Sequence, residues 1–104
     1  MIIRVIATRR VIDINDPQNF KAFSVCIEGA SDSPAVQAEL LGRIAVKSDR
    51  DHAWISEQIL RDWPQLKSES WWQNGLFGMI AAVQKFGWID QASRSIRAHI
   101  EYAP

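Results

Sequence analysis

The residues of this chain that are able to carry chemistry are few and scattered. Its two histidines are His52, which follows Asp49-Arg50-Asp51, and His99 near the C-terminus. A histidine beside carboxylates can hold a divalent ion or act as an acid–base pair. Four consecutive polar residues are more typical of a helix start, where the helix dipole favours aspartate. We therefore expect no catalytic residue and no metal ligand in this cluster.

The single cysteine and the remaining motifs give no stronger signal. Cys26 lies in the middle of an expected strand, where a free cysteine usually acts as a small, partly buried apolar side chain. No Cys/His spacing suits zinc, and the segment from Gly75 to Gly78 has bulky apolar neighbours and no preceding strand, unlike a phosphate-binding loop. The sequence thus favours a non-catalytic protein without a cofactor.

Tryptophan is the overrepresented residue type. The chain has five, all in its second half: Trp54, Trp63, Trp71, Trp72 and Trp88. Trp63, Trp72 and Trp88 lie on or beside apolar stripes, so we assign them to the core between helices and sheet. Trp71 is about 100° around the expected helix from Trp72, so the two cannot face one core. We predict that Trp71 is partly exposed and belongs to a partner-binding surface.

Basic residues on the expected strands form a second candidate surface. The set comprises Arg9, Arg10, Lys21, Arg43 and Arg97. A basic sheet face can meet an acidic protein or a phosphate backbone, although most such faces are simply solvated. The 12 basic and 12 acidic residues cancel, which argues against broad nucleic-acid binding. Three arginines join Trp71 in the predicted set that contacts a protein partner: Arg9, Arg10 and Arg43.

The best-defined element among those that position these residues is a helix over residues 70–86. Its apolar residues recur with the period of one buried helix face: Trp72, Leu76, Met79, Ile80, Val83 and Phe86. Ser70 is expected to cap the N-terminus, with Gln73 in the capping-box position. Gly87 is expected to supply the left-handed residue that ends the helix.

The same helix carries a stripe of small residues, Gly75, Gly78 and Ala82. A glycine inside a helix costs about 1 kcal/mol relative to alanine, so two of them require a packing reason. The usual reason is close approach of another backbone, either from the sheet of the same chain or from a second subunit. Because a formal net charge of zero also removes repulsion between copies, we predict a homodimer.

The N-terminal segment predicts one long strand. Residues 2–14 are rich in β-branched side chains, but their apolar residues change face partway along. A bulge near residues 8–10 would bring both sets to one side. A turn is expected over residues 15–19, where Pro17 pre-sets the turn dihedral.

Two further strands are expected to complete an antiparallel three-stranded meander. Residues 20–28 alternate apolar and polar side chains, and a turn is expected over residues 29–34. Residues 35–47 fit both a helix and a strand. Apolar residues at period two outnumber those at the helical period there, which favours a third strand.

The second half of the chain predicts two helices and a final strand. Ser48-Asp49-Arg50-Asp51 is expected to start a helix that ends before Pro64. The alternation over residues 96–102 favours a fourth strand beside the first, although a helix opened by Asp90 also fits. The expected fold is a single α+β domain, residues 1–104, with an antiparallel sheet, two helices on one face and the order β-β-β-α-α-β.

These features favour a small, non-catalytic protein that recognises another protein, as inhibitor, immunity or adaptor modules do. The alternative is a small-ligand-binding or enzymatic domain with a tryptophan-lined pocket between sheet and helices or at a dimer interface. No run of about 18 apolar residues is present, so no membrane span is expected. The lone Cys26 fits a reducing compartment, which predicts a cytoplasmic location.

Overall fold

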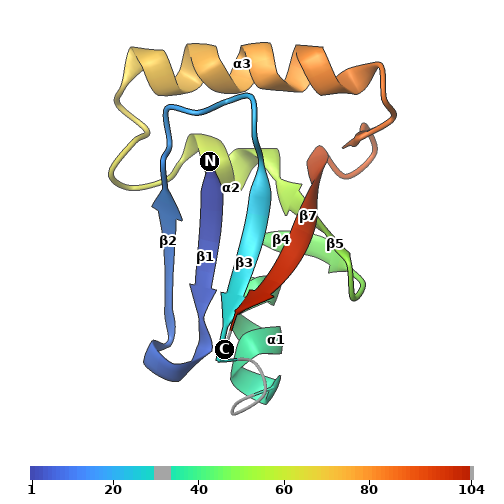
Figure 1. Cartoon of the computed structure of the whole chain (residues 1–104). Helices are drawn as coiled ribbons and strands as arrows, with labels where there is room; N and C mark the ends of the chain where they lie inside the picture. The colour runs from blue at the N-terminus through green and yellow to red at the C-terminus, as the bar shows by residue number, and fades with distance from the viewer. Residues whose placement is uncertain (30–33, 104) are drawn as a thin grey trace.

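The computed structural model describes residues 1–29 and 34–103, which contain a seven-stranded mixed sheet and three α-helices (Figure 1). The strands are β1 (Ile2–Ile6), β2 (Val11–Asn15), β3 (Ser24–Glu28), β4 (Ala45–Ser48), β5 (His52–Ser56), β6 (Ile89–Asp90) and β7 (Ser95–Ala103). The helices are α1 (Pro34–Gly42), α2 (Glu57–Arg61) and α3 (Ser70–Gln84), and a 3-10 turn, η1, spans Ala7–Arg9.

The strand β7 organises the sheet, whose order is β2-β1-β3-β7-β5-β4. β1 runs parallel to β3, and β3 runs parallel to β7. The β1–β2, β4–β5 and β5–β7 pairs are antiparallel. β6 also pairs with β7, at Ser95 and Ile96. One edge of β7 is taken by β5, so β6 pairs with the opposite edge, where β3 pairs with β7 from His99 onward.

The core lies on one face of this sheet. Cross-strand pairing places alternate apolar residues side by side there, as with Ile3 beside Val25 and Val25 beside Ile100. The helices contribute buried side chains to the same core: Leu40, Leu41, Leu60, Trp72, Leu76 and Met79. In Figure 1, α1 and α2 lie behind the sheet and α3 crosses the ends of its strands. Each of these large apolar side chains stabilises the fold by about 1.5–3 kcal/mol on burial.

The predicted antiparallel meander is wrong at its first strand. Residues 2–14 form the hairpin β1–β2 instead of one bulged strand, because η1 reverses the chain and Arg10 adopts a left-handed φ of 55°. The hairpin pairs Ile3 with Ile14, so both apolar sets reach one face by reversal. The turn expected at residues 15–19 is confirmed, since Asn19 N–H donates to the Asp16 carbonyl oxygen at 3.2 Å.

The segment predicted as a third strand, residues 35–47, contains α1 and then β4. Leu40 and Leu41 are both buried, which a helix permits and an alternating strand does not. The period-two pattern was therefore shared between two different elements. Residues 30–33 of the turn expected over residues 29–34 lie outside the described residues.

The helix expected from residue 48 to Pro64 is also wrong in its first half. Asp49 begins a turn that leads into β5, and α2 begins only at Glu57. The side chain of Ser56 caps this short helix by accepting the N–H of Ile59. Ile55 therefore packs in the core from a strand, whereas Ile59 is exposed.

The final strand is confirmed, but its place is not. β7 lies between β3 and β5 at the centre of the sheet and not beside β1. Together with the parallel pairs and the additional helix α1, this overturns the antiparallel β-β-β-α-α-β architecture. The observed order is β-β-β-α-β-β-α-α-β-β.

The long helix is confirmed in position and in most of its buried face. Ser70 is its first residue and not its cap; Glu69 occupies the cap position without a side-chain hydrogen bond. Phe86 is 58% exposed, because α3 ends at Gln84, before the position where Phe86 would join the buried face. Gly87 adopts the expected left-handed conformation, with φ of 76°. Within the described residues, no helix has the length and apolar character needed to cross a membrane.

Candidate functional site

The outward side of α3 is an uncharged surface, which we call the α3 outer face. It comprises the exposed residues Trp71, Asn74, Phe77, Gly78, Ala81 and Ala82. None of the 15 residues of α3 carries a formal charge. A helix that buries only one face normally carries charged residues on the other. The depletion of charge and the presence of Trp and Phe are instead typical of the core of a protein–protein interface.

Phe77 is the most prominent side chain of the α3 outer face, at 70% exposed. Together with Ala81 it borders a hollow of about 300 Å³ between α3, α2 and the turn that connects β6 to β7. Apolar residues of α3 and β6, including Ile80 and Ile89, line this hollow. Its polar edge contains Glu57, which accepts hydrogen bonds from Arg61 at 2.7 Å and Arg94 at 3.3 Å.

The surroundings of the two glycines of α3 differ, and only one of the two positions requires glycine for packing. A Cβ atom at Gly75 would collide with the ring of Phe20, so this glycine accommodates a side chain from the β2–β3 connection. A Cβ atom at Gly78 would meet nothing within 4 Å. The close neighbour predicted for Gly75 is therefore a ring and not a backbone, while Gly78 remains open on the α3 outer face.

Trp71 lies at the N-terminal end of the α3 outer face and is 37% exposed, in agreement with its predicted partial exposure. Its indole N–H donates to a Glu69 carboxylate oxygen at 3.1 Å. Its ring contacts the rings of Phe20 and Trp72 at centroid distances of 6.5 Å and 6.2 Å. These contacts restrict the orientation of the ring, which stays partly accessible to solvent.

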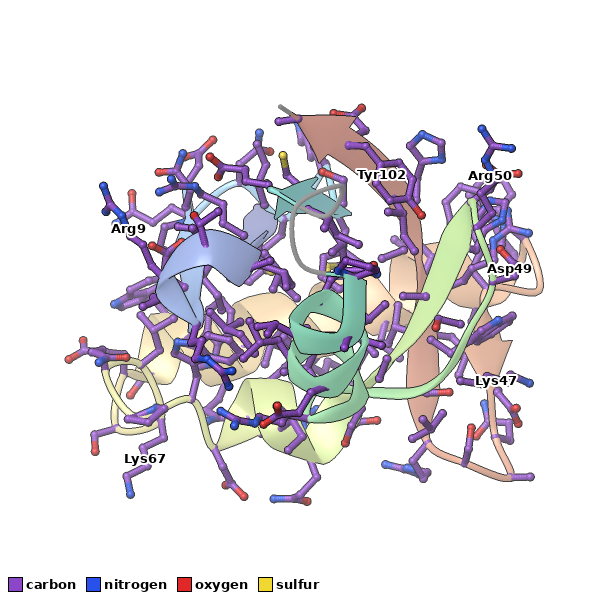
Figure 2. The ribbon with its side chains drawn as sticks, turned by 90° about the horizontal axis from the view of Figure 1, so that it is seen from below. Arg9, Lys47, Asp49, Arg50, Lys67 and Tyr102 are labelled. Carbon is purple, nitrogen blue, oxygen red and sulfur yellow. The ribbon has the colours of Figure 1, made fainter. Side chains whose placement is uncertain are left out.

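The predicted arginines lie away from Trp71 and away from any strand. Arg9 and Arg10 belong to η1 and its end, and Arg43 follows α1. Arg10 and Arg43 both contact the carboxylate of Glu39, at 3.7 Å and 2.6 Å. In Figure 1 the η1 turn and α3 lie at opposite ends of the strands, and Figure 2 shows Arg9 at the periphery of the molecule. The basic strand face is therefore not formed as predicted, because among the five basic residues of the expected set only Arg97 lies on a strand.

A different surface, of which the sequence indicated only Arg97 and His99, lies on the side of the sheet opposite the core. We call it the open sheet face. Across β4, β5 and β7 it presents a row in which Lys47 pairs with Trp54 and Trp54 pairs with Arg97. The Lys47 ammonium lies 4.7 Å from the centroid of the Trp54 ring, and the Arg97 guanidinium lies 5.1 Å from that of Trp88. Cations and aromatic rings therefore alternate along this row.

The two histidines meet in the next row of the open sheet face. His52 of β5 pairs directly with His99 of β7, and their ring centroids are 5.9 Å apart. Beside them is a hollow of about 220 Å³ lined by Phe23, His52, Trp88, Arg97 and His99. The alternation of residues 96–102 already places Arg97 and His99 on one face. Their partners from β5 and from Trp88 depend on strand pairing that no local pattern predicts.

Two predicted core tryptophans are less buried than expected. Only Trp72 of the three is fully buried, as expected. Trp63 is partly buried and packs against the core from outside. Trp88 is half-buried on the open sheet face, with the rings of Phe86 and Trp88 5.0 Å apart. Trp88 therefore belongs to a surface hollow and not to the interior.

Two further groups that the sequence singled out are the thiol of Cys26 and the carboxylate of Asp49. Burial raises the pKa of the Cys26 thiol, and the neighbouring carboxylates of Glu28 and Glu101 raise it further, so the thiol stays protonated at neutral pH. The carboxylate of Asp49 accepts the backbone N–H groups of His52 and Asp51, each at 2.8 Å, which lowers its pKa. Residues 1–29 and 34–103 contain no group of three or more His, Cys, Asp or Glu residues that would hold a metal ion.

Comparisons of this chain with protein families, curated proteins and solved structures found no match. Functional inference therefore depends on the two surfaces of the chain itself, the α3 outer face and the open sheet face.

Proposed function

We propose that this protein is a small, non-catalytic binding protein that recognises another protein through the α3 outer face. The observation that carries the proposal is a 15-residue helix without a charged residue, exposed along one side. The exposed side includes Phe77, at 70%, and Trp71, at 37%. Aromatic residues of this kind provide most of the binding energy in many protein interfaces.

The local geometry supports a protein partner with an apolar helix or loop. Gly78, Ala81 and Ala82 leave a shallow strip beside Phe77 and Trp71, along which another backbone can approach closely. The adjoining hollow of about 300 Å³ has a mixed lining, and its apolar part, which includes Ile80 and Ile89, suits one anchoring side chain of the partner. Its charged edge at Glu57 corresponds to the polar rim that surrounds a typical interface core.

Trp71 therefore remains in the proposed binding surface, and the three predicted arginines are not part of it. Arg9, Arg10 and Arg43 lie at the other end of the strands, and Glu39 already contacts two of their guanidinium groups. They would contact the same partner only if it extended along the whole sheet.

The proposal is tested by site-specific photocrosslinking in the native cell. A benzophenone amino acid at position 77 is expected to crosslink one partner protein, whereas the same group at the exposed position 50 does not. The purified partner should then bind the wild-type protein in calorimetry. The variant Phe77→Glu should weaken this binding at least tenfold, and the control Arg50→Glu should change it less than twofold.

Two results would overturn the proposal. One is crosslinking at position 77 that matches position 50, because an interface must distinguish the two sites. The other is crosslinking at position 77 exclusively to a second copy of the same chain, which would make the α3 outer face a dimer interface and not a recognition surface.

A further inference from the structure

The open sheet face has a break at its centre, next to β7. β6 pairs with Ser95 and Ile96, and β3 pairs with β7 only from His99 onward. Between these two strands, opposite Arg97, the chain places Trp88 and Phe23, one after α3 and one before β3. The N–H of Arg97 donates to the carbonyl oxygen of Trp88 at 2.8 Å, which fixes the segment that carries this indole.

The hollow of about 220 Å³ lies at this break. Phe23 and Trp88 supply aromatic rings, and Arg97, His52 and His99 supply nitrogen groups able to donate hydrogen bonds. No carboxylate belongs to the lining. The hollow therefore combines flat apolar surfaces with donors for an anion.

The position and the free donors of the Arg97 guanidinium favour contact with an anion. Its guanidinium lies 5.1 Å from the centroid of the Trp88 ring, and stacking of this kind restricts the side chain. Among the described residues, no carboxylate lies within ion-pair distance of Arg97, whereas Arg4, Arg43 and Arg61 each have one. The Asp49 carboxylate interacts with Arg97 electrostatically without forming an ion pair, so the guanidinium keeps the donors with which it can bind a phosphate through two parallel hydrogen bonds.

We propose that this hollow binds a nucleotide: a planar base against Trp88 and Phe23, with its phosphate on Arg97 and the two histidines. A volume of about 220 Å³ is below the usual range for ligand pockets, so the hollow would enclose only part of a nucleotide and leave the rest of it in solvent. The site is independent of the proposed recognition of a protein, because it lies on the open sheet face and not on the α3 outer face.

The same chemistry has two sources, a free nucleotide or one unit of a single strand. Trp54 pairs directly with Arg97 and lies beside Lys47, so a neighbouring base of a strand would find a second ring and a second cation there. A free nucleotide would leave this part of the row unused.

Calorimetry with three probes tests the site: adenosine 5′-monophosphate, adenosine and inorganic phosphate. We expect the monophosphate to bind at least tenfold more tightly than either fragment, because ring and phosphate are recognised together. Arg97→Gln should weaken its binding by about tenfold or more, as expected for loss of a charged hydrogen-bond donor. The matched control Arg9→Gln, with the same charge change at the far end of the sheet, should leave the affinity within twofold.

The site is overturned if adenosine binds as tightly as the monophosphate, if the two arginine variants behave alike, or if no binding occurs at millimolar ligand. Should Arg97→Gln fail to fold, His99→Ala replaces it, because His99 is exposed and its loss must also weaken the monophosphate. Phe77→Glu is expected to leave nucleotide affinity unchanged, so failure of the proposed protein recognition is distinguishable from failure of this site.

A single-stranded hexanucleotide identifies the source. If it binds more tightly than the monophosphate and Trp54→Ala removes the difference, the site takes a nucleotide within a strand. If it binds no more tightly, the ligand is a free nucleotide. A hexanucleotide whose binding is insensitive to Arg97→Gln would contradict the proposed site.

Discussion

Two neighbouring tryptophans show how one residue step separates a core position from a surface position. Trp72 is fully buried, and its indole N–H donates to the Leu60 carbonyl oxygen at 2.8 Å. We predict that Trp72→Ala lowers the free energy of unfolding by about 3–5 kcal/mol, through a cavity and an unpaired carbonyl group. Trp71→Ala should change it by less than about 1 kcal/mol, since this ring is partly solvated. Urea denaturation measures both, and equal losses would place both rings in the core.

The carboxylate of Asp49 makes a contribution to the stability of the folded state that depends on pH. Hydrogen bonds from the backbone N–H groups of His52 and Asp51 lower its pKa in the folded state. A lowered folded-state pKa means that the stabilisation is complete above the ordinary aspartate value, about pH 4, and is lost as the pH falls through the folded value. We predict that Asp49→Ala lowers the thermal midpoint at pH 7 and that the difference from wild type shrinks below about pH 4. Asp49→Asn, which keeps an acceptor oxygen, should lower the thermal midpoint less than Asp49→Ala does. A difference in midpoint between Asp49→Ala and wild type that stays constant with pH would contradict the stabilising role of the carboxylate.

At the scale of elements, α3 tests how the glycines of a helix are used. Gly78→Ala should stabilise the protein by about 0.5–1 kcal/mol, because the new methyl group enters open space and alanine favours the helix. Gly75→Ala should destabilise it, because the methyl group would displace the Phe20 ring from its contact with Trp72. Denaturation of both variants, with the double variant Gly75→Ala/Phe20→Ala as control, measures the two effects. Stabilisation by both single substitutions would show that Phe20 does not require the glycine.

The elements that the sequence predicts correctly are those whose pattern continues over one uninterrupted unit. The helical period of α3 and the alternation of β7 each extend over nine residues or more, so one period dominates. Residues 35–47 and 48–63 each contain a junction between a helix and a strand. Averaging across such a junction mixes the two periods, and the wrong element results.

The candidate sites show the same limit. The partial exposure of Trp71 follows from its angle on one helix, and the structure agrees with it. The arginine set assumed that Arg9, Arg10 and Arg43 lie on strands, and their placement changed with those strands. The open sheet face depends on pairing between β5 and β7, segments far apart in the chain. Such pairing is fixed by the tertiary fold, so only its outward-facing half, Arg97 and His99, could be predicted.

At the scale of the whole molecule, three exposed features are candidate interfaces between two copies of the chain: the edge strands β2 and β4, and the α3 outer face. The edges are poorly suited to pairing. They are five and four residues long, and each carries a charged side chain, Asp13 on β2 and Lys47 on β4. Short, charged edges are a common protection against strand pairing. The α3 outer face has no such protection, and the formal net charge of zero opposes no contact between copies.

We therefore predict a twofold dimer at tens of micromolar, formed through the α3 outer face whenever no other protein covers it. Sedimentation equilibrium should give a mass that rises with concentration above the 11.8 kDa of one chain. Phe77→Glu should hold the mass at that of the monomer, because it places a charge at the centre of a self-complementary contact. Val11→Lys, on the exposed edge of β2, is the control and should leave the dimer intact. A dimer lost with Val11→Lys and kept with Phe77→Glu would assign the contact to the sheet edge, and a constant mass of 11.8 kDa would exclude the dimer. The partner protein and the second copy would occupy the same surface, so adding the partner should dissociate the dimer.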